Sequence, residues 1–198
     1  MTDTTRIPLF PLLQPLFPGT RISLQIFEQR YLRMITECLK KQGTFGVVPI
    51  LEGSEVGAVP KVHPWGVTAD IVDWNQLENG LLGIVIEGGR RFQLHSSEVE
   101  KDGLVIGDVQ LRPLEVAVPL DDSDSDLEEL LAVLAEEFYP DDYHWEPPED
   151  SNTLGWQLAQ LLPVEPVLPI SLLELDDPLE RLERIRDWLD TVSQSEPS

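Results

Sequence analysis

The sequence has one cysteine, few basic residues and no long apolar run. The single cysteine, Cys38, cannot form an intramolecular disulfide or a thiolate metal cluster, so we interpret it as a buried, inert thiol. The apolar runs are short and interrupted by proline, and none approaches the ~20 residues that span a bilayer. The first residues lack the pattern of a secretory signal, so we expect a cytoplasmic protein with no membrane partner.

Basic residues are scarce, 14 against 36 acidic residues, and the net charge is −22. The imbalance lies in the second part of the chain. Residues 1–114 carry 13 acidic and 11 basic residues, whereas residues 115–198 carry 23 acidic and 3 basic residues. A negative field of this size repels phosphate backbones and favours basic partners, or serves solubility alone. We therefore expect no nucleic-acid partner.

Motifs for catalysis and for cofactor binding are also missing. A phosphate-binding loop needs a glycine followed by Lys-Ser or Lys-Thr, and the sequence contains neither. No lysine follows residue 114, which leaves none for a downstream serine–lysine dyad. His63, His95 and His144 lie too far apart to form a zinc-binding motif. We predict no catalytic residue, no cofactor and no metal ligand, and hence a protein that is not an enzyme.

The first ~118 residues are predicted to form short strands and one helix. Residues 21–26 alternate between apolar and polar, the period of a half-buried strand, and between residues 31 and 39 apolar side chains recur at helical spacing. The prolines between residues 8 and 18 favour an extended path at a sheet edge. Further strands are expected at 44–50, 67–72, 81–87, 91–95 and 104–111, with Gly88-Gly89 separating two of them.

The rest of the chain is predicted to be helical. Residues 125–128 have the spacing of a capping box for a helix that runs to Phe138, and a last helix begins at Asp177-Pro178. The apolar stripe of that last helix comprises Leu179, Leu182, Ile185, Leu189 and Val192. The predicted fold class is α+β: a mainly antiparallel sheet curled into a small barrel with one packed helix over residues 1–118, and an acidic helical subdomain over residues 119–198.

Three stretches carry a resemblance to a known family. The first begins Ile-Pro-Leu-Phe-Pro-Leu at residue 7 and runs into Phe27-Glu28-Gln29-Arg30-Tyr31; the second holds Gly46-Val47-Val48 and Glu55-Val56-Gly57; the third is Gly89-Arg90-Arg91-Phe92. Together they resemble the amino-terminal, substrate-binding domain of the bacterial Lon protease. The motif residues are Pro18, Gly19, Phe27, Glu28, Arg30, Tyr31, Gly46, Glu55, Gly57, Gly89, Arg91 and Phe92.

The resemblance implies a PUA-like pseudo-barrel followed by a helical bundle. It also implies a stand-alone module that holds polypeptide substrates or partner proteins, as an adaptor or sensor in protein quality control, without the ATPase and protease parts. We interpret the motif residues as structural. Because two of the motifs occur together in the family, we expect an ion pair between Glu28 and Arg91.

Aromatic residues are the peptide-binding candidates. Trp65 and Trp74 flank a predicted strand, and Tyr143 and Trp145 lie in an acidic loop. Exposed aromatic side chains anchor captured peptides, although the tryptophans can equally cover the ends of a barrel. The alternative function is a PUA-like RNA-binding module, which the net charge disfavours. The oligomeric state is left open.

Filter binding with RNA at low salt separates the two functions. A polypeptide-binding module with a net charge of −22 leaves the RNA in the filtrate, because the protein and the phosphates repel each other. A basic RNA-binding protein retained under the same conditions is the positive control. Retention of RNA by this chain, lost on addition of salt, would favour the RNA-binding alternative.

Overall fold

The computed structural model describes residues 4–139, 145–162 and 167–195. The chain divides into two compact units, Met1–Leu114 and Glu115–Ser198. That the two units are independent domains, with a boundary at residue 118, stays a prediction of the sequence.

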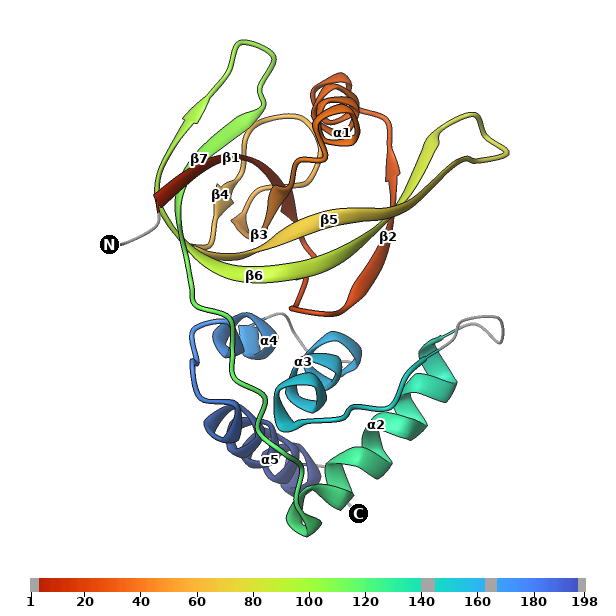
Figure 1. The fold of residues 1–198 in the computed structure, drawn as a ribbon, viewed down its shortest axis with the longest axis vertical. Coiled ribbons are helices and arrows are strands. Elements are labelled where there is room, and N and C mark those ends of the chain that lie inside the picture. Colours follow the sequence, from red (N-terminus) through yellow and green to blue (C-terminus); the bar gives the residue numbers. More distant parts are fainter. Residues whose placement is uncertain (1–3, 140–144, 163–166, 196–198) are drawn as a thin grey trace. The chain divides into compact units, whose positions relative to one another are not determined.

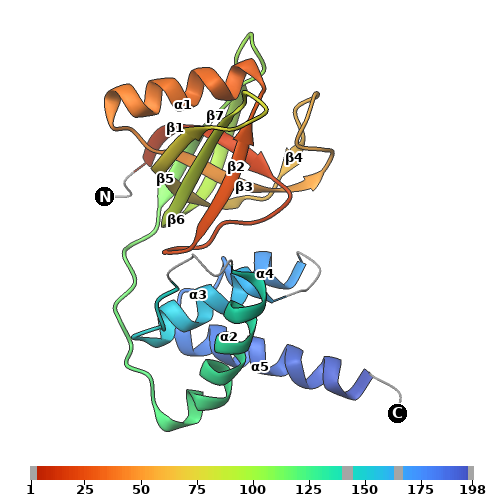
Figure 2. The same cartoon turned by 90° about the vertical axis from the view of Figure 1, so that its right-hand side faces the viewer.

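The first unit is a curved sheet with one helix across it (Figures 1 and 2). β1 pairs with β7 on one side and with β3 on the other, so the path β1-β7-β6-β5-β3 returns to β1 as a closed ring. Among the described residues, β2 lies outside this ring and pairs with β6 alone. The strands are β1 (Thr4–Leu12), β2 (Arg21–Ile26), β3 (Phe45–Glu52), β4 (Lys61–Val62), β5 (Trp65–Gln76), β6 (Leu82–Val99) and β7 (Val105–Leu111).

The sheet is mainly antiparallel, as predicted, and β1–β3 is its parallel pair. The expectation that the proline-rich start lies at a sheet edge is wrong, because β1 has a strand on each side. β7 pairs with residues 4–9 of β1 and β3 with residues 9–12, so the two partners overlap only at Leu9. Pro8 therefore faces β7 alone and Pro11 faces β3 alone, and each can lack an N–H on its unpaired side.

β6 is one continuous strand of 18 residues, so the expected break at Gly88-Gly89 is wrong. The segment that follows Phe17 crosses β6 at this point. Gly19 donates its backbone N–H to the Gly88 carbonyl at 2.8 Å, and Gly88 donates its own to the Thr20 carbonyl at 2.9 Å. A β-carbon on Gly88 would overlap the carbonyl oxygen of Phe17. Glycine is needed here because another backbone approaches closely, not because the chain turns.

α1 (Gln29–Lys41) lies across one side of the curved sheet (Figure 2). Its predicted stripe is buried at Tyr31, Met34, Ile35 and Cys38, and these side chains pack into one apolar cluster with residues of β1, β2, β3, β5 and β6. Leu39, which the spacing also placed on the stripe, is 40% exposed. Gln42 ends the helix in the left-handed conformation. A second cluster of strand residues comprises Ile7, Leu9, Val48, Phe92, Val105 and Val109.

The second unit is helical, with α3 in contact with α2, α4 and α5. Its helices are η1 (Asp122–Asp124), α2 (Ser125–Phe138), α3 (Ser151–Leu161), α4 (Val167–Leu172) and α5 (Pro178–Ser195). The capping box predicted at residues 125–128 is wrong, because Ser125 already has helical dihedrals. Asp121 and Asp124 form the box one turn earlier, where they cap η1. The start of α5 is confirmed: Asp177 accepts a hydrogen bond from the Leu179 backbone N–H at 2.9 Å.

An arginine occupies the centre of the helical unit. Arg181 on α5 is 0% exposed, and its Nη2 donates to Glu115 Oε1 at 2.8 Å. The guanidinium carbon lies 3.4 Å from the centroid of the Trp156 ring, and the Trp156 indole N–H donates to the same Glu115 carboxylate at 3.1 Å. The apolar stripe expected on α5 is therefore buried only in part, and Arg181 lies beside it in the interior. Leu182 and Ile185 are buried, but Leu179 and Val192 are 49% and 40% exposed.

Replacement of Gly88 by alanine tests the backbone crossing. We expect Gly88→Ala to lower the free energy of unfolding by about 1–3 kcal/mol, because the new methyl group must displace the Phe17 carbonyl. Gly43→Ala is the matched control: its β-carbon would meet only the Cys38 Cα, at 3.9 Å, and we expect a change within ~0.5 kcal/mol. Urea unfolding curves measure both. Equal effects of the two substitutions would contradict the close approach at Gly88.

Candidate functional site

The motif residues fall into three groups in the structure. Two of the groups serve packing: one is the Gly46–Phe92 contact, and the other lies at and around Gly88 on β6. Gly46 leaves room for the buried ring of Phe92, since a β-carbon there would lie 2.7 Å from that ring. Pro18 forms an isolated bridge to Gly88, and Gly19 takes a φ of 72° in the turn that follows. Gly89 packs against Thr68, and Arg91 is buried on β6. These positions serve the packing of the sheet and the turn that leads into β2.

The third group lies around a single hollow, which we call the β2 groove. Its walls are Phe10 and Leu12 of β1, residues 23–28, Tyr31, and the loop residues Glu55 and Val56. The hollow has a volume of about 170 Å³. Four residues predicted from the sequence motifs, Phe27, Glu28, Tyr31 and Glu55, thus line one groove although they come from separate parts of the chain.

The start of α1 fixes the inner end of the groove. Glu28 is the residue before the helix, and its carboxylate pairs with Arg30 Nη2 at 2.9 Å. The expected ion pair between Glu28 and Arg91 is therefore wrong: the arginine two residues along the chain takes this carboxylate. Arg30 is itself buried, and its guanidinium carbon lies 4.7 Å from the centroid of the Tyr31 ring. Tyr31 stacks on Phe10 of β1 with ring centroids 4.1 Å apart, which closes the floor of the groove.

The loop after β3 forms the opposite wall. Glu55 accepts a hydrogen bond from the Leu13 backbone N–H at 2.7 Å, which ties the loop to the end of β1. The glycines on either side permit the loop's path, since Gly53 and Gly57 have φ values of 112° and 91°. Val56, between Glu55 and Gly57, is 54% exposed. Phe27 and Leu13 are 51% and 54% exposed, so three large apolar side chains meet solvent on or next to this groove.

Burial raises the pKa of Tyr31 to about 12. The neighbouring Arg30 acts in the opposite direction, and Glu28 and Glu55 add to the increase. The phenol is therefore neutral at physiological pH. It offers the groove an aromatic surface and a neutral hydroxyl, not a base.

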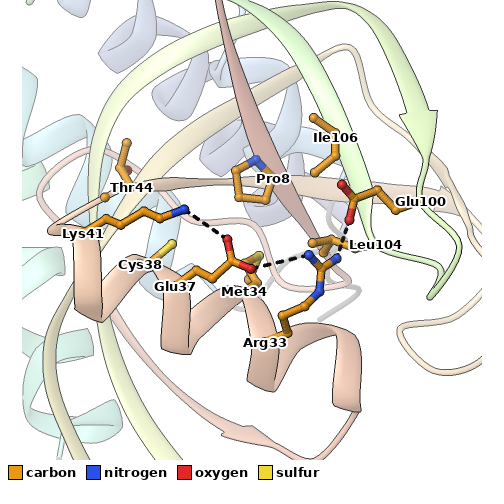
Figure 3. Close-up of a pocket in the computed structure, with 11 residues that line it drawn as sticks. Pro8, Arg33, Met34, Glu37, Cys38, Lys41, Thr44, Glu100, Leu104 and Ile106 are labelled. Carbon is orange, nitrogen blue, oxygen red and sulfur yellow. Dashed lines mark hydrogen bonds and ion pairs between the residues drawn. The ribbon is translucent and has the colours of Figure 1, made fainter.

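A second hollow of about 210 Å³ lies beside the later turns of α1 (Figure 3). Its apolar wall includes Pro8, Met34, Cys38, Leu104 and Ile106, and its rim carries Arg33, Glu37, Lys41 and Glu100. The rim charges already pair with one another: Glu37 lies 3.5 Å from Arg33 and 3.4 Å from Lys41, and Arg33 also pairs with Glu100. Burial raises the pKa of the Cys38 thiol, which favours the unreactive, protonated form.

Of the predicted aromatic anchors in the first unit, neither Trp65 nor Trp74 lines the β2 groove. Trp65 is half-buried, with the Arg112 guanidinium carbon 5.5 Å from its ring centroid. Trp74 is 60% exposed on β5 and does not line the β2 groove. Trp145 is half-buried, and its indole N–H has no hydrogen-bond partner within the described part of the chain. Tyr143 lies outside the described residues.

Sequence reasoning missed Leu24 and Val56 as groove residues. Val56 did carry a signal, because an exposed valine in a loop of glycines has no core to enter. Leu24 is on the predicted apolar side of its strand, yet it is only partly buried at the edge of the cluster under α1. The sequence alone does not tell which apolar residue of an amphipathic strand faces a groove.

In residues 4–139, 145–162 and 167–195, no three His, Cys, Asp or Glu side chains lie together as a metal site would require. None of the described helices combines the length and apolar character needed to cross a bilayer.

The comparisons with known proteins all point to the same family. Residues 6–191 match the family described as the ATP-dependent protease La (LON) substrate-binding domain. A Lon protease of Parabacteroides distasonis is 31% identical over 130 residues, which make up 65% of this chain and 15% of that protein. This chain therefore matches only a small part of the full-length protease.

Two solved structures share the fold over nearly the whole chain. A Lon N-terminal domain protein from Xanthomonas campestris has 33% sequence identity and a TM-score of 0.76, covering 93% of this chain and 98% of its own. The N-terminal domain of a Mycobacterium avium complex Lon protease has 20% identity and a TM-score of 0.66, covering 93% and 97%. The second likeness concerns the fold alone.

The raised pKa of Tyr31 predicts a loss of stability in alkali. In the unfolded chain the phenol ionises near its ordinary value of 10.0, whereas in the folded protein it ionises at about 12. The folded state therefore binds this proton more tightly, and the free energy of unfolding falls as the pH rises from about 10 to about 12. Each pKa unit corresponds to about 1.4 kcal/mol.

Tyr31→Phe should remove this part of the alkaline destabilisation, as measured by urea unfolding at a series of pH values. The difference between Tyr31→Phe and the wild type at pH 8, where the phenol is protonated in both the folded and the unfolded chain, is the internal reference. If Tyr31→Phe and the wild type lose stability in parallel above pH 10, the phenol is not held neutral by the fold.

Proposed function

Since this chain belongs to the LON substrate-binding domain family, we propose that it binds polypeptides without transforming them. Family membership makes it a substrate-recognition module. The finer proposal is a non-catalytic adaptor or sensor that holds unfolded segments of other proteins in protein quality control. A cytoplasmic location, a PUA-like class for the sheet and a bundle arrangement for the helices remain part of this proposal.

The β2 groove is the observation that carries the proposal. It is a hollow with exposed apolar side chains gathered at its margin, and exposed apolar side chains that lie together mark interaction sites. An unfolded polypeptide differs from a folded one mainly in the apolar side chains that it exposes. Phe27 and Val56 offer those side chains a surface on which to leave water, and each large apolar side chain buried contributes about 1.5–3 kcal/mol.

Charge makes the proposal more specific. The groove is lined by Glu28 and Glu55 and by no Lys, Arg or His. The chain as a whole carries a net charge of −22, which raises the encounter rate with basic polypeptides. The same charge disfavours the alternative function, an RNA-binding module.

Binding of an unfolded basic protein tests the proposal. Lysozyme that has been reduced and capped with neutral carboxamidomethyl groups stays unfolded, whereas native lysozyme has a similar charge in a folded form. We expect the unfolded form to bind at least tenfold more tightly, as measured by fluorescence anisotropy of a labelled probe. Equal affinity for both forms would mean that charge alone drives association, and would contradict recognition of unfolded segments.

The double variant Phe27→Ser, Val56→Ser should weaken binding of unfolded lysozyme about tenfold or more, because two apolar contacts are lost. Val133→Ser, at a site on α2 that is 61% exposed, is the matched control and should bind like the wild type. If the control weakens binding as much as the double variant, the β2 groove is not the site.

A further inference from the structure

We propose that the free edge of β2 receives an extended polypeptide segment as an added β-strand, with an apolar side chain in the β2 groove and a lysine or arginine beside Glu55. This inference rests on the proposed function and deepens it, because it names the bound conformation and the chemistry of the bound segment.

β2 pairs with β6 in an unbroken antiparallel register from Arg21 to Ile26. It lies outside the ring of strands, and in the described part of the chain no strand pairs with its other side. The backbone hydrogen bonds of residues 23–26 are therefore those of the β6 ladder. The N–H and C=O groups that point to the opposite side are free to bind a further strand.

Exposed edges are usually protected against a further strand by proline, by lysine, by a bulge or by an inward-pointing charge. β2 has none of these between its ends. Its middle residues are Ile22, Ser23, Leu24 and Gln25, and its register contains no shift. Arg21, the one charged residue of the strand, sits at its first position and pairs with Glu87 across the ladder at 2.6 Å. The remaining length of the edge is open to pairing.

The groove runs along this same edge. Residues 23–26 line it as a continuous stretch, and the facing wall is Leu12 with the loop residues Glu55 and Val56. A strand added to β2 would point alternate side chains to one face of the sheet. The volume of about 170 Å³ suits one such side chain and is smaller than the roughly 300 Å³ at which pockets for drug-sized molecules begin. The groove thus fits a peptide side chain better than a metabolite.

The two carboxylates of the groove differ in what they already bind. Glu28 is paired with the buried Arg30, so its charge is largely compensated. Glu55 accepts a hydrogen bond from the backbone of Leu13, which is neutral, and no ion pair of Glu55 is found among the described residues. A positively charged side chain of a bound segment is therefore attracted mainly to the Glu55 carboxylate. This asymmetry places the basic residue of the bound segment at the loop side of the groove.

A short peptide of alternating residues, acetyl-Lys-Val-Thr-Phe-Thr-Val-Lys-amide with a fluorescent label, is the probe. An added strand directs every second N–H to β2 and the others to solvent. N-methylation at the two Val and the Phe, or instead at the two Thr, removes one set or the other. We expect one of the two methylated peptides to bind at least tenfold more weakly than the parent, and the other to bind within about threefold of it.

The protein side of the test is Glu55→Gln, which keeps an acceptor for the Leu13 N–H and removes the charge. We expect it to weaken binding of the lysine peptide about three- to tenfold and to leave a peptide with Thr in place of Lys unaffected. Glu78→Gln, at an exposed position that does not line the groove, is the matched control and should change neither affinity.

The outcomes separate this inference from the proposed function. If unfolded lysozyme binds but the two methylated peptides lose affinity equally, or neither loses any, strand addition is overturned and polypeptide binding stands. If the parent peptide fails to bind while unfolded lysozyme binds, the inference is likewise overturned. If the chain sediments as a dimer that the peptide dissociates, a second copy occupies the edge, and the assignment of the edge to a foreign segment is overturned. If neither probe binds, the proposed function itself fails.

Discussion

The crossing at Gly88 is the constraint on which the first unit depends. β6 is long enough to pair with β2 in its first part and with β7 in its last part, and β5 accompanies it past the crossing. The segment from Phe17 to Thr20 meets β6 where the partner changes, and hydrogen bonds in both directions hold it there. Because Gly88 has no side chain, this segment can approach β6 closely and lead into β2, which pairs with the first part of β6. A larger residue would force the Phe17 carbonyl away from β6 and strain the start of the β2–β6 ladder.

Two features of the groove follow from this arrangement. First, β2 lies outside the ring, so no strand of the described residues pairs with one side of its backbone. Second, two residues, Phe27 and Glu28, connect the end of β2 to the start of α1. This short connection keeps both residues beside the end of the strand. The stacking of Tyr31 on Phe10 then closes the space below. The groove is the hollow that remains between a strand edge, a helix start and the loop that Glu55 ties to β1.

Much of this fold could be predicted from local sequence patterns. The stripe of α1 and the alternation in β2 depend on neighbours a few residues apart, so their periodicity is visible in the chain itself. Gly88 was misinterpreted because a glycine pair looks the same whether it turns the chain or admits a crossing backbone. The prolines of β1 were assigned to a sheet edge for a related reason. β7 and β3 each pair with only half of β1, and the sequence of β1 alone does not reveal such a staggered arrangement.

The ionic contacts were the least predictable part. Glu28 was expected to bind Arg91, but Arg30 is two residues away and needs no loop to close before the pair forms. Arg181 was not recognised as a buried residue, because its carboxylate partner lies 66 positions earlier in the chain. The candidate site was predicted in part: the motifs supplied Phe27, Glu28, Tyr31 and Glu55, whereas their convergence on one groove required the three-dimensional structure.

The Glu115–Arg181 contact also decides where the chain can be divided. Glu115 belongs by sequence to the connection between the two units, yet its carboxylate serves a fully buried guanidinium and the indole of Trp156. A helical fragment that begins at residue 119 would lack that carboxylate. The buried Arg181 guanidinium would then lose the negative charge that Glu115 supplies, which destabilises the fragment. The segment around Glu115 is therefore part of the helical unit and not a spacer. A fragment in which the buried Arg181 keeps this carboxylate partner must begin no later than Glu115.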